Sequence, residues 1–320
     1  MHYFNLIRNK PKDKIVRKKV KYSFPIYKKP IIKEEISTKE EQREYYNQFK
    51  KRDSRIKIWL NNISKLQKPL INSFDINKII IKEYDLSFPK NLFINNISSM
   101  YYKGRVGRQL DLLIYHDNIP LAYIQYGSPV LNKQLAEWIK NKYGKIDFSF
   151  INKKIVDLSV CISFGILTKF LSGKLAVFVA LSKETINIFN EKYGTDVEVI
   201  FTTSVFGKSS LYNRVRNLKY LGLTEGYHSI LPEECIEEIQ KLYKKYFPHR
   251  KIKKTALAEH IIRMYDHLQE AGIKLSFKIP KLARGVYICE TLLPLKDNLE
   301  YWYNRWFLPR RSRIIVNDLF

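Results

Sequence analysis

The stretch Leu110-Asp-Leu-Leu-Ile-Tyr-His-Asp-Asn-Ile-Pro-Leu-Ala-Tyr-Ile-Gln-Tyr126 decides the fold of this chain. Two runs rich in branched and aromatic residues flank the polar pair Asp117-Asn118, which is the pattern of a β-hairpin. Gly127-Ser128-Pro129 then ends the second run, because proline cannot continue a sheet ladder. The stretch therefore predicts a β-hairpin in the central sheet of a globular domain.

A mixed sheet flanked by helices is expected from the residues that follow the hairpin. The run 155–164 is apolar almost throughout, which is typical of a central strand. A helix is expected over 173–193, although residues 175–181 taken alone also fit a strand. A further strand is expected over 197–203 and a helix over 209–220. This alternation predicts an α/β (α+β) fold.

The chain of 320 residues is long enough for one or two domains. Its composition suggests three parts: a basic arm and helix over 1–70, the core over 71–232, and an extension over 233–320 that is helical and rich in arginine and tryptophan. Glycine-rich linkers are absent from the sequence, so the last part is expected to pack on the core.

Helices are also expected outside the core. In the first part, one helix is expected over 39–66. In the last part, helices are expected over 233–246, which begins with glutamates, and over 255–271, which Gly272 terminates.

The charge of the chain is its strongest compositional feature. It contains 57 Lys and Arg against 31 Asp and Glu, a formal net charge of +26, and 45% of its residues are hydrophobic. A folded protein with this excess is expected to bind a polyanion, of which nucleic acid is the commonest, because each neutralised phosphate releases a counterion. An anionic membrane surface is the alternative. Part of the excess also fits the Lys-, Asn- and Ile-rich composition of an AT-rich genome.

Several classes of protein are not expected. Cys161, Cys235 and Cys289 are widely spaced and lie in no pattern of metal ligands, so we expect reduced thiols and no metal site. No apolar run approaches the ~20 residues of a membrane span. The N-terminus lacks the apolar segment of a signal peptide, so a cytoplasmic protein without membrane association is expected.

Basic residues gather in three places outside the expected strands. In the N-terminal arm they alternate with Tyr22, Phe24 and Tyr27, a pattern typical of backbone contact combined with base stacking, although these rings can equally pack on the domain. The other two places are the loop before the hairpin and the C-terminal tail. The candidates for nucleic-acid binding are Lys18, Lys19, Lys28, Lys29, Lys103, Arg105, Arg108, Arg310 and Arg311.

A second informative stretch is Ile200-Phe-Thr-Thr-Ser-Val-Phe-Gly-Lys-Ser-Ser-Leu-Tyr-Asn-Arg214. An apolar strand breaks here into a glycine, small hydroxyl residues and a Tyr-Asn-Arg segment. Polar chemistry is therefore expected where a central strand ends and the sheet opens to a ligand. Ser204 can orient a substrate amine, and Asp157 can act as a base if it faces the cleft. Capping of the following helix is an alternative role for Ser209.

Substrate and anion contacts are expected around this point. Ser172, Gly173 and Lys174 open the expected helix 173–193, where free N–H groups favour an anion, although a tight turn that needs glycine is the alternative. A phosphate-bearing donor and a DNA phosphate both fit. The candidates for substrate binding are Gln125, Ser128, Thr203, Lys208, Ser209, Asn213 and Arg214.

The order hairpin, strand, long helix, strand, polar turn and helix resembles the core of the GNAT acyltransferases. In that fold the central strands splay apart and hold acyl-coenzyme A, with its pyrophosphate at the helix after the fourth strand. The corresponding segment Lys169-Phe-Leu-Ser-Gly-Lys-Leu175 lacks the full Gln/Arg-x-x-Gly-x-Gly pattern. The resemblance implies that Tyr212 protonates a leaving thiolate, and Tyr220 competes for this role because of its spacing to Gly222.

A more specific resemblance is carried by three segments, Leu121-Ala-Tyr-Ile-Gln-Tyr-Gly-Ser-Pro129, Leu171-Ser-Gly-Lys-Leu-Ala176 and Thr202-Thr-Ser-Val-Phe-Gly-Lys-Ser-Ser-Leu-Tyr-Asn-Arg214, the last followed by Tyr220-Leu-Gly-Leu-Thr-Glu-Gly226. They resemble the family of the Druantia anti-phage protein DruA over roughly residues 100–230. More distantly, the chain is similar to the phage Mom family, which modifies adenine in DNA.

The DruA and Mom resemblances imply DNA as a partner, and the DruA resemblance implies a helicase as well. Two functions are therefore expected as alternatives. One is a group-transfer enzyme that modifies a nucleobase, with the donor in the strand-end cleft. The other is a non-catalytic DNA-binding component of a phage-defence or mobile-element system.

Overall fold

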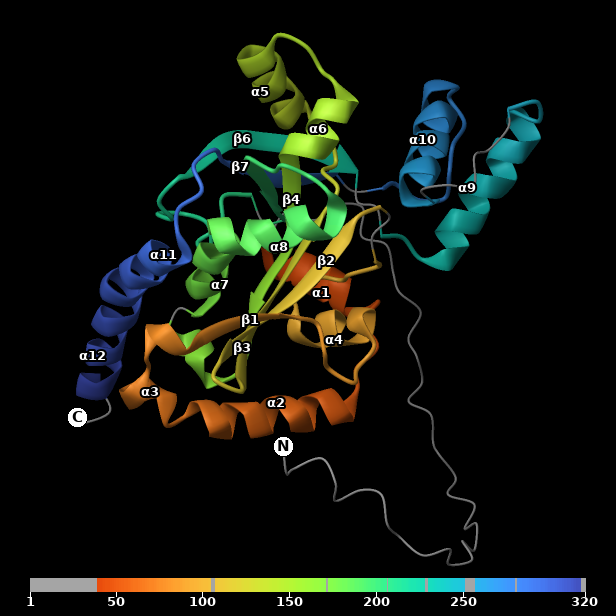
Figure 1. Ribbon diagram of the computed structural model, residues 1–320. Coiled ribbons are helices and arrows are strands. Elements are labelled where there is room, and N and C mark those ends of the chain that lie inside the picture. Colours follow the sequence, from red (N-terminus) through yellow and green to blue (C-terminus); the bar gives the residue numbers. More distant parts are fainter. Residues whose placement is uncertain are drawn as a thin grey trace, which may run out of the picture.

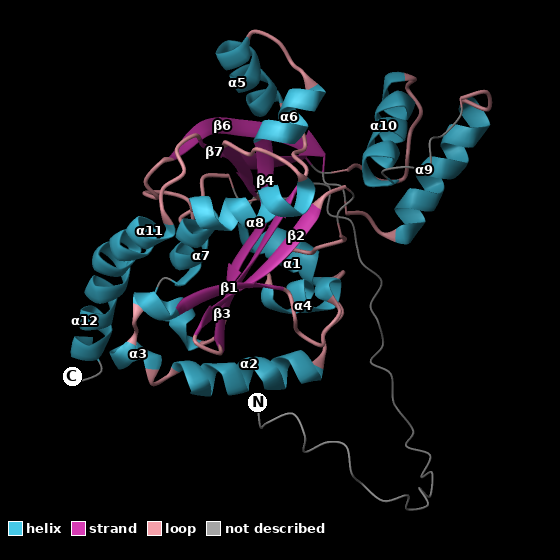
Figure 2. Cartoon of the chain, in the orientation of Figure 1, coloured by secondary structure: helices cyan, strands magenta, loops and turns pink. Residues whose placement is uncertain are grey.

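The computed structural model describes residues 39–104, 107–170, 172–205, 207–227, 230–250, 257–279 and 281–317. Lys18, Lys19, Lys28, Lys29 and Arg105 lie outside these residues. The described part is a seven-stranded mixed sheet with helices packed on both faces (Figure 1). Figure 2 shows how the helices surround the strands. The expected mixed α/β fold is thus confirmed.

The sheet has the strand order β1-β2-β3-β4-β5-β7-β6. Among these strands, β4 and β5 are the parallel pair and the other neighbours are antiparallel. The strands are β1 Ile79–Glu83, β2 Gln109–His116, β3 Ile119–Gly127, β4 Ile155–Ser163, β5 Val199–Ser204, β6 Leu218–Tyr227 and β7 Lys281–Cys289.

The predicted hairpin is β2 and β3, and it is confirmed. Its two strands are buried along almost their whole length, so the apolar residues on both faces meet packed helices. The turn places Asp117 at a φ of 51°, a left-handed conformation that aspartate tolerates better than most residues. The predicted strand 155–164 is confirmed as β4, in the middle of the sheet.

The parallel contact between β4 and β5 is short. Its register runs from Ile155 opposite Val199 to Asp157 opposite Phe201 and ends there. Beyond this point β4 stays paired with β3 and β5 stays paired with β7. The two central strands therefore part after Asp157, the third residue of β4, and after Phe201, three residues before the end of β5.

Twelve α-helices surround the described sheet. A 3-10 segment, Ile166–Phe170, precedes α7, and a π-helical segment, Tyr303–Phe307, joins α11 to α12. The helices are α1 Lys39–Asn47, α2 Ser54–Gln67, α3 Leu70–Ser73, α4 Lys90–Ile97, α5 Lys133–Tyr143, α6 Phe148–Lys154, α7 Ser172–Ala180, α8 Lys183–Tyr193, α9 Glu233–Tyr246, α10 Leu257–Glu270, α11 Leu295–Trp302 and α12 Leu308–Asn317.

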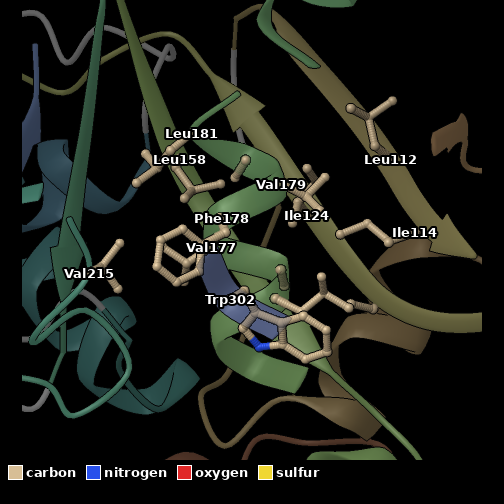
Figure 3. Packing of buried hydrophobic residues seen from close by; sticks show 14 of the residues in the cluster. Leu112, Ile114, Ile124, Leu158, Val177, Phe178, Val179, Leu181, Val215 and Trp302 are labelled. Atoms are coloured by element: carbon tan, nitrogen blue, oxygen red, sulfur yellow. The ribbon is translucent and has the colours of Figure 1, made fainter. Parts of the chain in front are cut away.

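The largest core cluster surrounds α7, in which eight of the nine residues are buried. Figure 3 shows Val177, Phe178 and Val179 of this helix between the sheet and Trp302 of α11. The Asn298 side-chain amide donates to the Phe178 carbonyl at 3.0 Å, which fixes α11 on α7. Because α7 is apolar on all sides, it must be enclosed rather than laid on a surface.

Two helices that we expected to be continuous are broken. The helix expected over 39–66 is α1 and α2, because Asp53 starts a new helix by accepting the backbone N–H of Arg55 at 2.8 Å. The helix expected over 173–193 is α7 and α8. They are separated at Ser182, whose extended backbone (φ −95°, ψ 150°) bridges to Leu293.

The prediction of a helix over 209–220 is wrong. Residues 210–217 form turns and β6 begins at Leu218. Arg214 and Asn217 adopt positive φ values of 61° and 65°, which a right-handed helix does not allow. The carbonyls of this turn are held by a lysine from another part of the chain, so its conformation is set by tertiary contacts.

The part of the chain after residue 232 contributes to the sheet. The sequence did not indicate β7, yet β7 lies between β5 and β6. The helix expected over 233–246 is confirmed as α9. The helix expected over 255–271 is α10, although Thr255 lies outside the described residues. The expected boundary at residue 232 therefore does not separate the sheet from the last part of the chain, because β7 belongs to the same sheet.

The helices α9 and α10 form a lobe inserted between β6 and β7. They pack on each other through their own core, which includes Ile239, Tyr243, Met264 and Leu268. Figure 1 shows this lobe projecting from one end of the sheet. We refer to residues 231–279 as the helical lobe.

None of the described helices is long and apolar enough to cross a membrane. The described part contains no group of three or more His, Cys, Asp or Glu side chains that could hold a metal ion, and the three cysteines are unpaired.

A buried glutamine joins α2 to the end of β4. The Gln67 amide donates to the Pro120 carbonyl at 2.7 Å and the Phe164 carbonyl at 3.2 Å, and its oxygen accepts the Leu167 N–H at 3.2 Å. Gly165 lies against it, with a φ of +77°. A Cβ atom at Gly165 would lie 2.2 Å from Gln67 Oε1, so only glycine fits here.

Gly165→Ala should lower the free energy of unfolding by about 3–5 kcal/mol, because it combines left-handed strain with loss of the Gln67 hydrogen bonds. Gly144→Ala is the matched control, since Gly144 has a φ of +76° with nothing within 4 Å of its Cβ position. This control should lose about 1 kcal/mol from strain alone. Urea unfolding of both variants measures the difference, and equal losses would contradict the role given to Gln67.

Candidate active site

The residues predicted to form a site at the end of β5 lie close to where β4 and β5 part. Thr202 bridges the opening, because its Oγ1 donates to the Leu158 carbonyl of β4 at 2.7 Å. The Tyr212 hydroxyl lies 3.2 Å from the same Thr202 Oγ1. The turn after β5 therefore returns Tyr212 to the point where the central strands part.

Tyr212 is almost completely buried and its ring packs at 5.1 Å from the Tyr287 ring. Burial, reinforced by the nearby Cys161 and by the Asp157 carboxyl, raises the pKa of Tyr212 well above its usual value. The phenol is therefore neutral at physiological pH and keeps a proton that it can donate. The competing Tyr220 lies on β6, is 36% exposed, and its ring lies 5.1 Å from the Tyr287 ring in a tilted arrangement.

The remaining candidates on β4 and β5 divide between the two faces of the sheet. Thr202 and Ser204 alternate with Thr203 along β5, so Ser204 shares the face of Tyr212 and Thr203 faces the other side. Asp157 is opposite Phe201 and so shares the face of Thr203. Both Ser204 and Asp157 are buried. Ser204 therefore lies on the same face of the sheet as Tyr212, and Asp157 lies on the opposite face.

The Lys174 side chain is hydrogen-bonded to the turn that carries Tyr212. Its Nζ donates to the carbonyls of Ser210 at 3.0 Å, Leu211 at 3.2 Å and Asn213 at 2.7 Å. It also lies 4.5 Å from the centre of the Trp306 ring. Burial and the charge of Arg214 lower the pKa of Lys174 to about 8. Anion binding by Lys174 stays a prediction, and it would require the ammonium to leave these carbonyls.

The other two residues at the start of α7 are packed tightly. Ser172 is buried, and its hydroxyl has no hydrogen-bond partner within the described part of the chain. A Cβ atom on Gly173 would lie 3.2 Å from Leu211 Cδ1, so the glycine allows the turn to approach the helix. The start of α7 and the turn after β5 therefore form one unit.

The turn itself presents two cations to solvent. Ser209 is held inside it, since its N–H donates to the Tyr287 hydroxyl at 2.7 Å and its Oγ accepts the Leu211 N–H at 3.1 Å. Lys208 and Arg214 are exposed, and Lys208 Nζ lies 5.4 Å from the centre of the Tyr220 ring. These two residues are the turn's accessible substrate-binding candidates.

Gln125 and Ser128 have structural partners. Gln125 is completely buried, and its amide donates to Asp111 at 2.8 Å. Ser128 exchanges bonds with Arg108: its N–H donates to the Arg108 carbonyl at 3.2 Å, and its Oγ accepts the Arg108 N–H at 3.3 Å. These contacts fasten the open ends of the β2–β3 hairpin. Substrate binding by either residue stays a prediction.

The described nucleic-acid candidates differ in accessibility. Lys103 is exposed. Arg108 donates to the Asn152 carbonyl and packs at 5.4 Å over the Phe189 ring, so its guanidinium is engaged within the fold. Arg310 is exposed and its Nε donates to the Lys169 carbonyl at 3.2 Å, whereas Arg311, the next residue on α12, is half-buried.

A buried carboxylate network centred on Asp111 was not expected from the sequence. The Tyr123 hydroxyl donates to Asp111 at 2.5 Å, and the Lys90 ammonium donates to it at 2.6 Å. The side-chain amides of Gln109 and Gln125 donate further hydrogen bonds to the same carboxylate. Burial alone would raise the pKa of Asp111, but these bonds together hold it below its usual value. The signal was one acidic residue inside an apolar strand, which requires a partner.

Asp111→Asn should lower the free energy of unfolding at pH 7 by about 2–4 kcal/mol, because the buried Tyr123 hydroxyl and the exposed Lys90 ammonium lose a charged acceptor. Since the native pKa lies below the ordinary value of 3.8, this stability is complete above that pH and is lost as the pH falls through the native pKa. Urea unfolding of wild type and variant should therefore converge in acid. A loss no larger than that of Asp196→Asn, an exposed carboxyl paired with Lys154, would contradict this role.

Lys174→Met should lower the free energy of unfolding by about 2–4 kcal/mol, because three partly buried hydrogen bonds to the turn lose their charged donor while the apolar stem is retained. Lys140→Met is the control, since Lys140 is exposed on α5. Denaturant unfolding followed by tryptophan fluorescence measures both. Equal stability of the two variants would show that the turn does not depend on Lys174.

The chain was compared with known proteins. The sequence model of the family described as Druantia protein DruA matches residues 27–301, which is most of the chain. None of the curated proteins matches it. The matched range includes every strand of the sheet and the turn that carries Tyr212. The chain belongs to the DruA family, and this membership indicates a role in Druantia anti-phage defence.

Proposed function

We propose that this protein acts on DNA within Druantia defence, and that the opening between β4 and β5 is a group-transfer site. The observation that carries the proposal is the position of Tyr212. A neutral, buried phenol is held at the point where two central strands part, next to the hydroxyl of Thr202 and on the same face of the sheet as Ser204. Sites of this kind occur where a sheet opens at its strand ends.

Two features support a GNAT-like core, as the sequence resemblance implies. The parallel strands β4 and β5 diverge after three residue pairs. A helix, α7, follows β4 and begins beside the turn that carries Tyr212. The resemblance implies a donor at the start of this helix.

The residues at the start of α7 fit the pyrophosphate of coenzyme A only in part. The Ser172 hydroxyl, which has no hydrogen-bond partner among the described residues, suits an anion, but the Lys174 ammonium is already bound to three carbonyls. Acyl-coenzyme A is therefore not required by the proposal. The chain's own contributions are a proton held on Tyr212 and a hydroxyl on Ser204 that can orient an amine.

DNA as the partner is supported by charge. The net charge of +26 is accompanied by exposed cations near the site, namely Lys208 and Arg214. Lys103 and Arg310 extend the exposed positive surface to other elements. Bases of duplex DNA would have to leave the stack to reach the opening between β4 and β5.

A second function is favoured by one observation. Lys174 and Tyr212 both make internal contacts that complete the turn without a ligand. A chain in which the core has kept its fold and lost its donor would look the same. In that case the protein is a non-catalytic DNA-binding component, working with a helicase of the same defence system.

Mass analysis of nucleosides from cells that express the protein separates the two functions. With wild type, a new modified nucleoside is expected, and Tyr212→Phe should reduce its amount at least ~10-fold if the phenol supplies a proton. Tyr193→Phe is the matched control, because the Tyr193 hydroxyl also makes internal bonds, to Gln109, away from the opening. Unmodified DNA with binding intact would contradict group transfer to DNA and favour the second function.

A further inference from the structure

A lysine-lined surface lies between α2, the 3-10 segment Ile166–Phe170 and α12. It contains two hollows of about 450 Å³ each. Ser64 lines the first hollow and the next residue, Lys65, lines the second. In the same way, Lys169 lines the first hollow and Phe170 lines the second. The hollows therefore lie side by side, and we call them together the basic groove. Figure 1 shows α2 and α12 approaching each other near α3, where the second hollow lies.

The charge of the basic groove is of one sign. Lys65, Lys68 and Lys169 line it, and neither hollow has an Asp or Glu among its lining residues. All three lysines are exposed, and none of them forms a salt bridge with a carboxylate among the described residues. Arg310 adds a further cation, bound to the Lys169 carbonyl. Such an arrangement attracts an extended anion.

The floor of the first hollow is apolar. Leu60, Ile97, Phe164 and Ile166 supply most of it. Three of its five polar side chains already donate within the fold: the Asn96 amide donates to the Lys51 and Leu92 carbonyls, Ser64 to the Leu60 carbonyl, and Thr168 to the Gly165 carbonyl. A flat apolar group can occupy such a hollow, and few donors are left to recognise its edge by hydrogen bonds.

From these contacts we infer that the basic groove binds single-stranded DNA, with phosphates on the lysines and an unstacked base in a hollow. This inference rests on the proposed association with DNA. A duplex keeps its bases stacked inside, so only a single strand can place a base in a hollow. Because three of the five polar side chains of the first hollow already donate within the fold, few groups are left to read the edge of a base, and binding has little sequence preference.

The test compares two triple variants by fluorescence anisotropy with a labelled oligo-dT of about 15 nucleotides, within the range of single-strand site sizes. Lys65→Glu, Lys68→Glu and Lys169→Glu together change the basic groove. Lys241→Glu, Lys244→Glu and Lys245→Glu are the matched control, with the same change of charge on exposed α9 of the helical lobe. Thermal melting checks that both are folded, and Lys→Gln variants replace any that is not.

The groove variant should bind oligo-dT at least ~10-fold more weakly, and the slope of log affinity against log salt should fall by about 2, for three phosphate contacts. The control should lose less than ~3-fold. Wild type should also prefer oligo-dT over an abasic oligonucleotide of equal length by ~3-fold or more, a preference that the groove variant lacks.

Three results would overturn the inference. Equal losses in both triple variants would mean that bulk charge alone binds the strand. Equal affinity of wild type for oligo-dT and the abasic strand would exclude a base in the hollow. Tighter binding of duplex than of oligo-dT, lost in the groove variant, would assign the groove to duplex DNA. If wild type binds no DNA at low salt, the proposed function itself fails. This outcome is distinct from the three above, in which wild type binds DNA but the basic groove is not a site for a single strand.

Discussion

The structure depends on the enclosure of α7. This helix is apolar on every side, so it is stable only if other elements cover its whole surface. Its neighbours meet it with polar as well as apolar contacts: the Tyr126 hydroxyl of β3 donates to the Ala180 carbonyl, and Asn298 of α11 donates to Phe178. The turn after β5 covers the remaining end through Lys174. The candidate active site is thus formed by the same packing that holds the core together.

The sequence was sufficient to predict elements whose signals are local. The β2–β3 hairpin and β4 follow from runs of strand-forming residues and their terminators, which need no information from elsewhere. The helix expected over 209–220 failed because a lysine 36 to 39 residues away fixes the turn. The strand β7 was missed because it follows a long insertion and its two partners, β5 and β6, precede that insertion.

The same distinction holds for the candidate site. That polar residues would meet at the end of β5 was predictable, because a strand end in a central sheet is a recurring place for a site. Which of them are accessible was not. Gln125 and Lys174 have the residue types of binding groups, yet distant partners use all or most of their polar atoms. Burial and hydrogen-bond partners come from the tertiary structure, so residue type alone overestimates the number of available contacts.

The placement of the helical lobe has a consequence for folding. Tyr227 and Lys281 are opposite each other in the β6–β7 ladder, so the lobe enters and leaves the sheet at adjacent points. Closing a loop of this length costs conformational entropy, but the cost grows only with the logarithm of the loop length. The contact of α9 with α10 is local and can form early, which shortens the loop that β7 must close. An inserted module of this kind can vary in sequence and size while the sheet beneath it keeps its register.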